Sequence, residues 1–356
     1  MRYIDEYRDE GDAKKLLAAI RKTVTRPWAL MEICGGQTHT FVKFGIDRML
    51  PDEVQLVHGP GCPVCVTPLE MIDKAHEIAR RPDVIFTSFG DMLRVPGSDG
   101  DLLSAKAAGA DVRIVYSPLD AVKLAARNPD REVVFFAVGF ETTAPMTAAI
   151  LLEPPPDNLF VLVEHKRIPP ALTALLDLPD NRIGAYLAPG HVSTIIGTQP
   201  YEQWLADRHL PVVVGGFEPL DILYAVALIL RQHRDGTPRI ENGYPRAVDR
   251  EPNAAARALI DRVFEPSDAT WRGIGTIPDS GLQLRDAFRR FDASDRFPID
   301  LPETREAIPG CRCPDVLTAR AVPSDCPLFS VRCTPLSPVG PCMVGSEGAC
   351  SIWFRY

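Results

Sequence analysis

The sequence predicts an α/β protein built on parallel sheets and completed by a cysteine-rich C-terminal segment. Up to about residue 240, short runs of β-branched and other apolar residues alternate with runs of helical pattern. This alternation predicts parallel sheets with helices on both faces. Several short runs are apolar throughout, which is typical of parallel strands buried on both faces. Beyond residue 240 the strand-like runs fade, proline becomes frequent and cysteines accumulate.

Eight segments carry the strand pattern, and two helix starts are readable. The expected strands are Ala29–Ile33, Val54–Val57, Val84–Thr87, Val112–Tyr116, Val133–Val138, Leu159–Val163, Ile183–Leu187 and Val212–Val214. Thr67, followed by Pro68 and Glu70, has the spacing of a capping box and predicts a helix N-terminus. Ser117 with Pro118 predicts a second one.

A short echo in the sequence indicates two α/β domains of related design. Val133–Val138 leads into Gly-Phe-Glu at residues 139–141, and Val212–Val214 leads into the same three residues at 216–218. A chance match of three residues explains the echo equally well. We expect domains at residues 1–130, 131–240 and 241–356.

The overall composition excludes several classes of protein. Hydrophobic residues make up 46% and charged residues 24%, which is ordinary for a globular protein. With a net charge of −8 and no basic patch, nucleic acid is not an expected partner. The longest apolar stretch, Leu220–Leu230, contains Asp221 and is too short to span a bilayer. The acidic N-terminus is unlike a secretory signal, so we expect a cytoplasmic protein.

Nine cysteines are the unusual feature of the chain. In a reducing compartment, clustered cysteines more often bind metal or act in redox chemistry than form static bridges. Three lie near the front, at Cys34, Cys62 and Cys65. The others crowd the C-terminal segment, at Cys311, Cys313, Cys326, Cys333, Cys342 and Cys350.

The spacing of the C-terminal cysteines lacks the paired Cys-x-x-Cys motifs of zinc ribbons and the spacings of ferredoxins. No histidine lies among them. Thiolate-only ligation leaves zinc or an iron–sulfur cluster as alternatives. Four thiolates complete one site, so two cysteines are left for thiol chemistry. A structural zinc site held by four thiolates stays open at this point.

Cys62 and Cys65 form a Cys-x-x-Cys motif directly before the helix expected at Thr67. A helix N-terminus carries partial positive charge and lowers the pKa of a nearby thiol, so the motif favours a redox-active pair. Half of a zinc site is the alternative, although no second Cys-x-x-Cys motif completes it.

Cys34 lies at the end of the strand Ala29–Ile33, where open α/β sheets bind their ligands. Gly35 and Gly36 allow a ligand to approach the backbone closely. His39 follows five positions after Cys34, so the imidazole and the thiol are candidates for sharing a metal or a proton. The alternative is a buried cysteine that acts as a small hydrophobic residue.

Two further turns follow strands and precede helices. The turn Gly139–Thr143, which contains Glu141, offers N–H groups and hydroxyls to an anion or to a polar group of a partner. An ordinary strand–helix turn capped by threonine explains it at least as well. His191, in the turn Gly190–Ser193, occupies a place where histidine is more often structural than catalytic.

Together these motifs resemble the hydrogenase maturation factor HypD family over nearly the full length of the chain. The matching stretches are Met31–Thr40, Gly59–Cys65, Gly139–Thr143, Pro189–Ser193, Gly216–Asp221, Cys333–Pro335, Pro338–Val344 and the cysteines of the tail. Each is modest alone, but their order makes a specific set. The chain departs from the family where Pro314 follows Cys313 in place of glycine, and where Gly345-Ser346-Glu347-Gly348 replaces Ser-Ser-Glu-Gly.

The resemblance implies two Rossmann-like α/β domains and a third domain that holds a 4Fe–4S cluster. The implied cluster ligands are Cys311, Cys326, Cys333 and Cys350. The resemblance leaves Cys313 and Cys342 as a second thiol pair beside the redox pair Cys62 and Cys65. It also implies that Cys34 helps to hold an iron ion, with His39 close by. The Gly139–Thr143 turn, with Glu141, would line the same cleft or contact a partner.

The function implied by the resemblance is assembly of the iron centre of nickel–iron hydrogenases, with its two cyanides and one carbon monoxide. The chain would act as a redox-active scaffold more than as a turnover enzyme. It would work in complex with a HypC-type chaperone and receive cyanide from a HypE-type partner. A soft thiolate suits low-spin iron that transiently carries these ligands.

Two other functions fit parts of the sequence. An iron–sulfur thiol–disulfide reductase that acts on a partner protein would use the same cysteine pairs but leave Cys34 idle. A dinucleotide-dependent enzyme with a structural zinc tail would need a G-x-G-x-x-G run after a strand, and the sequence contains none.

Overall fold

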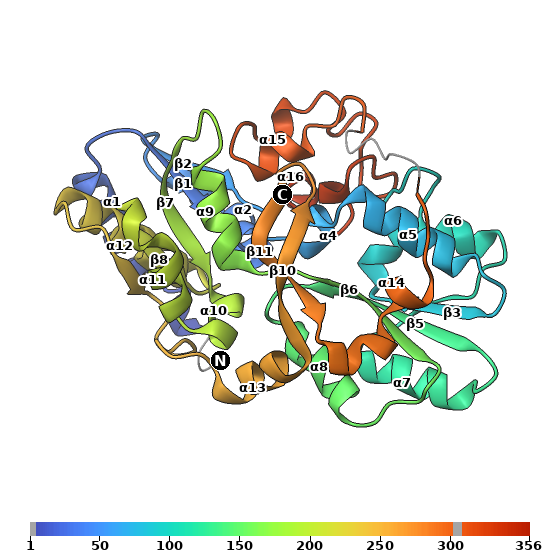
Figure 1. Cartoon of the computed structure of the whole chain (residues 1–356). Coiled ribbons are helices and arrows are strands. Elements are labelled where there is room, and N and C mark those ends of the chain that lie inside the picture. Colours follow the sequence, from blue (N-terminus) through green and yellow to red (C-terminus); the bar gives the residue numbers. More distant parts are fainter. Residues whose placement is uncertain (1–4, 302–307) are drawn as a thin grey trace.

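The computed structural model describes residues 5–301 and 308–356, and in these ranges it contains two parallel sheets and an antiparallel hairpin. Sheet A has the strand order β2-β1-β7-β8-β9, and sheet B has the order β4-β3-β5-β6. The two sheets lie in opposite lobes, with the hairpin of β10 and β11 between them (Figure 1). The C-terminal segment, drawn in red, lies above both lobes in this view.

The strands of sheet A are β1 (Trp28–Glu32), β2 (Val54–His58), β7 (Ile183–Pro189), β8 (Val212–Gly215) and β9 (Ile240–Asn242). The strands of sheet B are β3 (Val84–Ser88), β4 (Val112–Ile114), β5 (Glu132–Gly139) and β6 (Leu159–His165). Neighbouring strands in both sheets run parallel. The eight strands expected from the sequence are confirmed, with ends that differ by one or two residues.

The expectation that strands fade beyond residue 240 is wrong. The edge strand β9 and the hairpin of β10 (Phe264–Trp271) and β11 (Gly275–Leu284) follow that residue. The hairpin lacks the apolar run of a central strand, because β10 alternates between buried and more exposed positions and contains Pro266 and Asp268. Such a half-exposed pattern is easily taken for a loop.

The domain boundary expected near residue 130 does not separate the two sheets. The chain leaves sheet A after β2, builds sheet B from β3 to β6 and then returns to sheet A with β7. Strands from both sides of residue 130 therefore enter each sheet. Sheet A is discontinuous in sequence, whereas sheet B is formed by one continuous segment.

The two sheets share one topology. Numbered in chain order within each sheet, the strands of sheet A follow the order 2-1-3-4-5 and those of sheet B the order 2-1-3-4. This is the doubly wound order of flavodoxin-like folds. The Gly-Phe-Glu echo does not mark equivalent positions, since it follows the third strand of sheet B and the fourth strand of sheet A.

Helices cover both faces of sheet A. One face packs against α1 (Glu10–Thr23), α2 (Gly35–Lys43) and α12 (Pro219–Arg234). The other face packs against α9 (Ile168–Leu176), α11 (Gln199–Leu205) and part of the C-terminal segment. The strands between these layers are almost fully buried, which explains their continuous apolar runs.

Sheet B is covered in the same way. One face carries α5 (Leu69–Ala79) and α6 (Leu102–Ala107), and the other carries α7 (Pro118–Arg127), α8 (Ala144–Leu152) and the β10–β11 hairpin. Ser117 caps α7 as expected, with its side chain accepting a hydrogen bond from the backbone of Leu119. Further helices lie between these elements: α3 (Ile46–Met49), α4 (Pro63–Val66), η2 (Gly90–Arg94), α10 (Gly190–Ile196), α13 (Ala254–Val263), η4 (Asp286–Phe291) and α14 (Ala293–Arg296).

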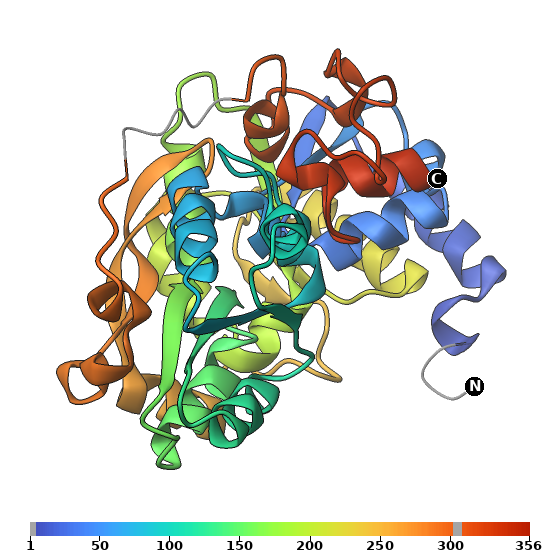
Figure 2. The ribbon, with the colours of Figure 1, turned by 90° about the vertical axis from the view of Figure 1, so that its right-hand side faces the viewer.

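The C-terminal segment consists of turns and very short helices. Its elements are α15 (Cys313–Leu317), η5 (Pro323–Asp325), η6 (Pro341–Met343) and α16 (Ala349–Arg355). Helix α16 contacts α2 of sheet A, and Figure 2 shows it beside the N-terminal helices. Within the described ranges, every helix is too short or too polar to cross a bilayer.

Candidate functional site

A cleft of about 710 Å³ opens between the carboxyl ends of the two sheets. Most of its lining residues lie in the segments that follow β1 and β7 in sheet A and β3 and β5 in sheet B. Each pair of strands flanks the point at which the strand order of its sheet reverses, which is where open α/β sheets bind ligands. Two such switch points therefore face a single cleft.

Cys34 is the thiol at the switch point of sheet A. It follows β1, serves as the N-cap of α2 and is only 7% exposed. Gly61 packs against it so closely that a side chain there would collide with the backbone of Ile33 and Cys34. The Cys-x-x-Cys segment can therefore pass directly behind the Cys34 loop.

The Cys34 thiol is held in its protonated form by its surroundings. Burial, followed by the charges of Glu347 and Glu32, raises the pKa of the thiol to about 12, although the N–H groups of Gly36 and Gln37 oppose the shift. A bound cation supplies the positive charge that favours the thiolate. The site therefore suits a metal ligand better than a free nucleophile.

Glu32 organises the backbone beside Cys34. Its carboxylate accepts hydrogen bonds from the backbone N–H of Cys34 at 3.1 Å and from the hydroxyl of Thr38 at 2.5 Å. The Nδ1 atom of His58 lies 2.6 Å from the same carboxylate. The indole of Trp353 in α16 donates to His58 Nε2 at 2.8 Å, so Nδ1 carries the hydrogen and donates to Glu32.

The sequence alone did not predict the hydrogen-bond network around Glu32, although the sequence contains one indication of it. Glu32 is a carboxylate in a strand that is otherwise apolar, and it is only 2% exposed. A buried carboxylate needs several donors, and these come from segments distant in sequence. The partners His58 and Trp353 carry no local signal of their own.

Two acidic side chains join Cys34 in the cleft. Asp91 comes from the segment after β3, and Glu347 comes from the C-terminal segment. Burial and the neighbouring Asp91 raise the pKa of Glu347. Sequence reasoning noted Glu347 only as part of a motif, and Asp91 not at all. Together they place negative potential beside the thiol, which attracts cations.

The Cys-x-x-Cys motif begins a helix, but one turn earlier than expected. Cys62 is the N-cap of α4, and its sulfur accepts a hydrogen bond from the Cys65 backbone at 3.3 Å. Thr67 ends α4 instead of starting the next helix, so the expected capping box is wrong. Cys65 is fully buried, and burial raises its pKa in contrast to the expected lowering by the helix terminus.

Cys313 and Cys342 are joined by a disulfide, in the pairing that the family resemblance implies. Helix α4 packs against η6, which contains Cys342. The Cys65 thiol points at the carbonyl oxygen of Pro341, at 3.9 Å, and Pro341 directly precedes Cys342. The two cysteine pairs are therefore neighbours, although they come from opposite ends of the chain.

The other four C-terminal cysteines gather in one place. Burial raises the pKa of Cys350, and the charges of Cys311, Cys333 and Cys326 raise it further. Backbone N–H groups point at two of the sulfurs: that of Cys313 at Cys311 Sγ at 3.5 Å, and that of Val339 at Cys333 Sγ at 3.3 Å. Gly340 leaves the space beside Cys311 Sγ open.

This donor set fits a 4Fe–4S cluster. Four thiols that repel one another as thiolates are stabilised by bound iron, and N–H groups aimed at sulfur are among the features that tune such clusters. In residues 5–301 and 308–356, no three Cys, His, Asp or Glu side chains converge closely enough to hold a single metal ion.

Three other candidate residues lie in different places. His39 does not line the cleft, and its Nε2 atom lies 3.3 Å from the hydroxyl of Tyr356. His191 lines the cleft and stacks on Phe217, with ring centroids 3.8 Å apart. The Gly139–Thr143 turn borders the cleft, but its Glu141 lines a separate pocket.

Comparisons with known proteins identify the family of the chain. The family model HypD, described as "Hydrogenase formation hypA family", matches residues 12–356. The chain is 47% identical to the hydrogenase maturation factor HypD of Escherichia coli K12, with 100% of this chain and 98% of the relative covered. It is 46% identical to the hydrogenase expression/formation protein HupD of Azotobacter chroococcum, covering 100% and 97% of the two chains. The chain therefore belongs to the HypD family of hydrogenase maturation factors.

Proposed function

We propose that the chain is the scaffold on which the iron centre of nickel–iron hydrogenases receives its two cyanides and one carbon monoxide. The main support for this proposal is the position of Cys34. It is a buried thiol at one of the two switch points that face a shared cleft. Family membership as a hydrogenase maturation factor supports this assignment. The iron ion is cargo in this proposal and leaves with the finished ligands.

The cleft residues act on the iron in three ways. Cys34 binds it through sulfur, and the iron charge offsets the burial that otherwise keeps this thiol protonated. Asp91 and Glu347 draw the cation into the cleft. Glu32 fixes the backbone of Cys34, because it accepts that residue's N–H as well as the donors of Thr38 and His58.

The C-terminal thiols hold the cluster and pass electrons toward the cleft. Cys311, Cys326, Cys333 and Cys350 are the proposed ligands of a 4Fe–4S cluster, which supplies single electrons when bound. Two electrons and two protons convert the Cys313–Cys342 disulfide into two thiols. The Cys313 and Cys342 thiols can then reduce a Cys62–Cys65 disulfide by exchange, so that the Cys62–Cys65 bond opens while the Cys313–Cys342 bond closes again.

The partners in this proposal are a HypC-type chaperone, which shares the iron, and a HypE-type protein, which delivers cyanide. The cleft supports such a complex because it is open to solvent at the carboxyl ends of both sheets. A bound partner would cover the iron and exclude water while the ligands are added.

Infrared spectroscopy tests the proposal. The chain purified without oxygen together with a HypC-type partner should show the stretching bands of iron-bound cyanide and carbon monoxide. The Cys34→Ala variant, prepared in parallel, should bind the partner and the cluster but show no such bands. A brown complex that lacks the bands, yet reduces disulfides of a partner protein, would favour the reductase alternative.

A further inference from the structure

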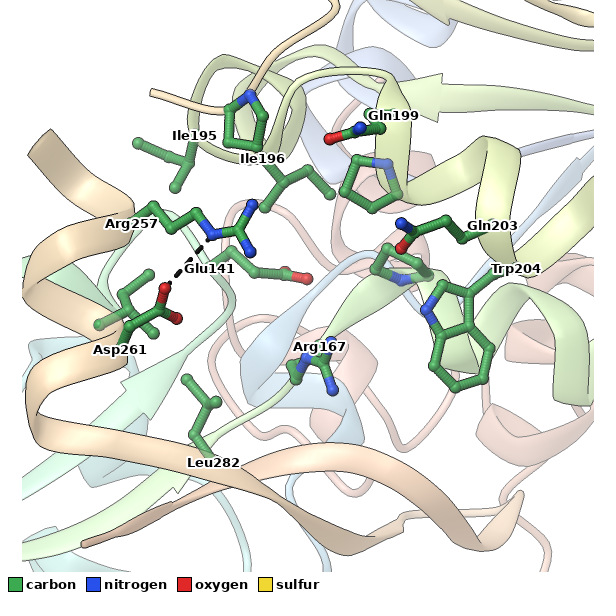
Figure 3. A pocket seen from close by; sticks show the side chains of 14 residues that line it. Glu141, Arg167, Ile195, Ile196, Gln199, Gln203, Trp204, Arg257, Asp261 and Leu282 are labelled. Atoms are coloured by element: carbon green, nitrogen blue, oxygen red, sulfur yellow. Dashed lines mark hydrogen bonds and ion pairs between the residues drawn. The ribbon is translucent and has the colours of Figure 1, made fainter. Parts of the chain in front are cut away.

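A second pocket lies on the opposite side of the Gly139–Thr143 turn from the Cys34 cleft. It has a volume of about 200 Å³ and is formed by α10, α11, α13 and β11 together with Glu141 and Arg167. Ile195 lines both spaces, so the turn and this side chain form the wall between them. Figure 3 shows the carboxylate of Glu141 pointing into the pocket.

Glu141 has an oxygen that lacks a hydrogen-bond partner. The side chain is 5% exposed, and its Oε1 atom accepts a hydrogen bond from the backbone N–H of Ile168 at 2.9 Å. The Oε2 atom is buried and has no partner among the described residues. A buried acceptor without a donor is costly, so such an atom in a pocket indicates a site for a donor group of a ligand.

Arg167 supplies the opposite charge in the same pocket. Its guanidinium donates to the carbonyl oxygen of Asp279 at 2.7 Å and makes no ion pair with Glu141 or with another carboxylate in the described ranges. Arg257, by contrast, is paired with Asp261 at 3.3 Å, as the dashed line in Figure 3 shows. The pocket therefore presents one hydrogen-bond acceptor, Glu141, and one cation, Arg167, that form no ion pair with each other.

Apart from Gln199 and Gln203, the remaining wall is apolar. Ile195, Ile196 and Leu282 line one side, and the indole of Trp204 lies opposite them (Figure 3). With Glu141 ionised, the charges of the lining residues sum to zero, because Arg167 and Arg257 balance Glu141 and Asp261. Two side chains of each sign give the pocket no net charge with which to favour a simple cation or a simple anion.

We propose that this pocket binds a free α-amino acid with an apolar side chain. The ammonium group donates to Glu141 Oε2, and the carboxylate accepts from Arg167. The side chain packs against Trp204 and the isoleucines. The volume exceeds the space of several waters, so it accommodates a small molecule of this size. Because the site adjoins the cleft without including Cys34, its occupancy does not depend on the proposed iron chemistry.

Calorimetric titration of the purified full-length chain tests this inference with three probes of similar shape. L-Leucine carries both charges, 4-methylpentanoate lacks the ammonium group and 3-methylbutylamine lacks the carboxylate. We expect L-leucine to bind about tenfold or more tightly than either single-charge probe, since each charge-assisted hydrogen bond adds appreciable affinity. Equal affinity for one of the truncated probes, or no heat with L-leucine at millimolar concentration, would overturn the proposal.

Two variants and a control locate the site. Glu141→Gln replaces the Oε2 acceptor by a donor and should weaken L-leucine binding about tenfold or more. Arg167→Gln should do the same at a less buried position. Glu202→Gln removes a nearby α11 carboxylate that pairs with Arg250 at 2.7 Å and lies outside the pocket, so binding should be unchanged. Unchanged binding in the Glu141→Gln and Arg167→Gln variants would place the ligand elsewhere.

Discussion

The two groups of thiols in this chain are positioned by different means. Cys34, Cys62 and Cys65 follow strands of sheet A and are buried, and Cys62 and Cys65 belong to the core that lies against that sheet. Of the four free thiols of the C-terminal segment, Cys350 lies in the first turn of the seven-residue helix α16, and the other three lie between short helices. Among the described residues, a core cluster formed solely within that segment contains only Val316, Ala321 and Ala349, while Cys333 and Cys350 join the core that lies against sheet A.

The comparison indicates which thiols support the structure around them. A thiol placed by a sheet can be removed without loss of the sheet, since neighbouring apolar side chains hold the backbone. Thiols in a segment with little core of its own hold that segment through the group they bind. The first group should therefore be needed for function, and the second for both function and local order.

The largest expected effect follows from removing a C-terminal thiol. We expect Cys326→Ala to lose most of about four irons and four sulfides per chain, to loosen residues 308–356 and to abolish hydrogenase maturation. Iron and sulfide analysis after anaerobic reconstitution, together with limited proteolysis, measures this. A variant that keeps its cluster and its protease resistance would show that Cys326 is no ligand.

Removing Cys34, a thiol positioned by sheet A, should impair function without loss of local order. Cys34→Ala should abolish hydrogenase maturation while the cluster, the brown colour and the α/β fold remain. The residue is small and buried, so alanine leaves the packing of β1 and α2 nearly unchanged. Hydrogenase activity in cells that carry only the variant checks this, and normal activity would refute the role of Cys34.

The Cys313–Cys342 disulfide lies between the two groups of thiols. Its loss should have an effect intermediate between those of the Cys326 and Cys34 variants. The double variant Cys313→Ser, Cys342→Ser should keep its cluster and bind a HypC-type partner, because neither cysteine is a proposed ligand. It should fail to build the iron–cyanide centre, since the electron path to Cys62 and Cys65 is cut. Cluster loss would reassign the ligands, whereas full maturation would mean that the bridge is only structural.

The smallest expected effect concerns Glu141, a buried group placed by β5. Burial raises the pKa of this carboxyl from its usual value near 4.5 to about 7. The folded chain therefore holds a proton that the unfolded chain releases, and stability is lost as pH rises from 4.5 to 7. Relative to Glu141→Gln, the free energy of unfolding should fall by about 3 kcal/mol across this range.

Urea unfolding of the wild type and the Glu141→Gln variant at several pH values measures this difference. The pH dependence should be the same with and without the cluster, because Glu141 belongs to the sheet-placed part of the molecule. A dependence that disappears when the cluster is removed would contradict the separation of the two regions.

The sequence alone determined the local elements of the α/β part. Parallel strands buried on both faces need continuous apolar runs, so β3 and β5 could be read directly. A helix start such as Ser117-Pro118 is encoded within a few residues, because a cap satisfies its own turn. The position of Cys34 at a strand's carboxyl end followed from the same local pattern.

Only the tertiary structure decided which strands share a sheet and which side chains meet. Strands β2 and β3 follow one another in the sequence, yet they belong to different sheets, because strand order depends on long-range packing. Glu347 reaches the cleft from the far end of the chain, and Glu141 turns away from it within a turn that borders it. A side chain's direction depends on burial and charge contributed by distant segments, which no local pattern contains.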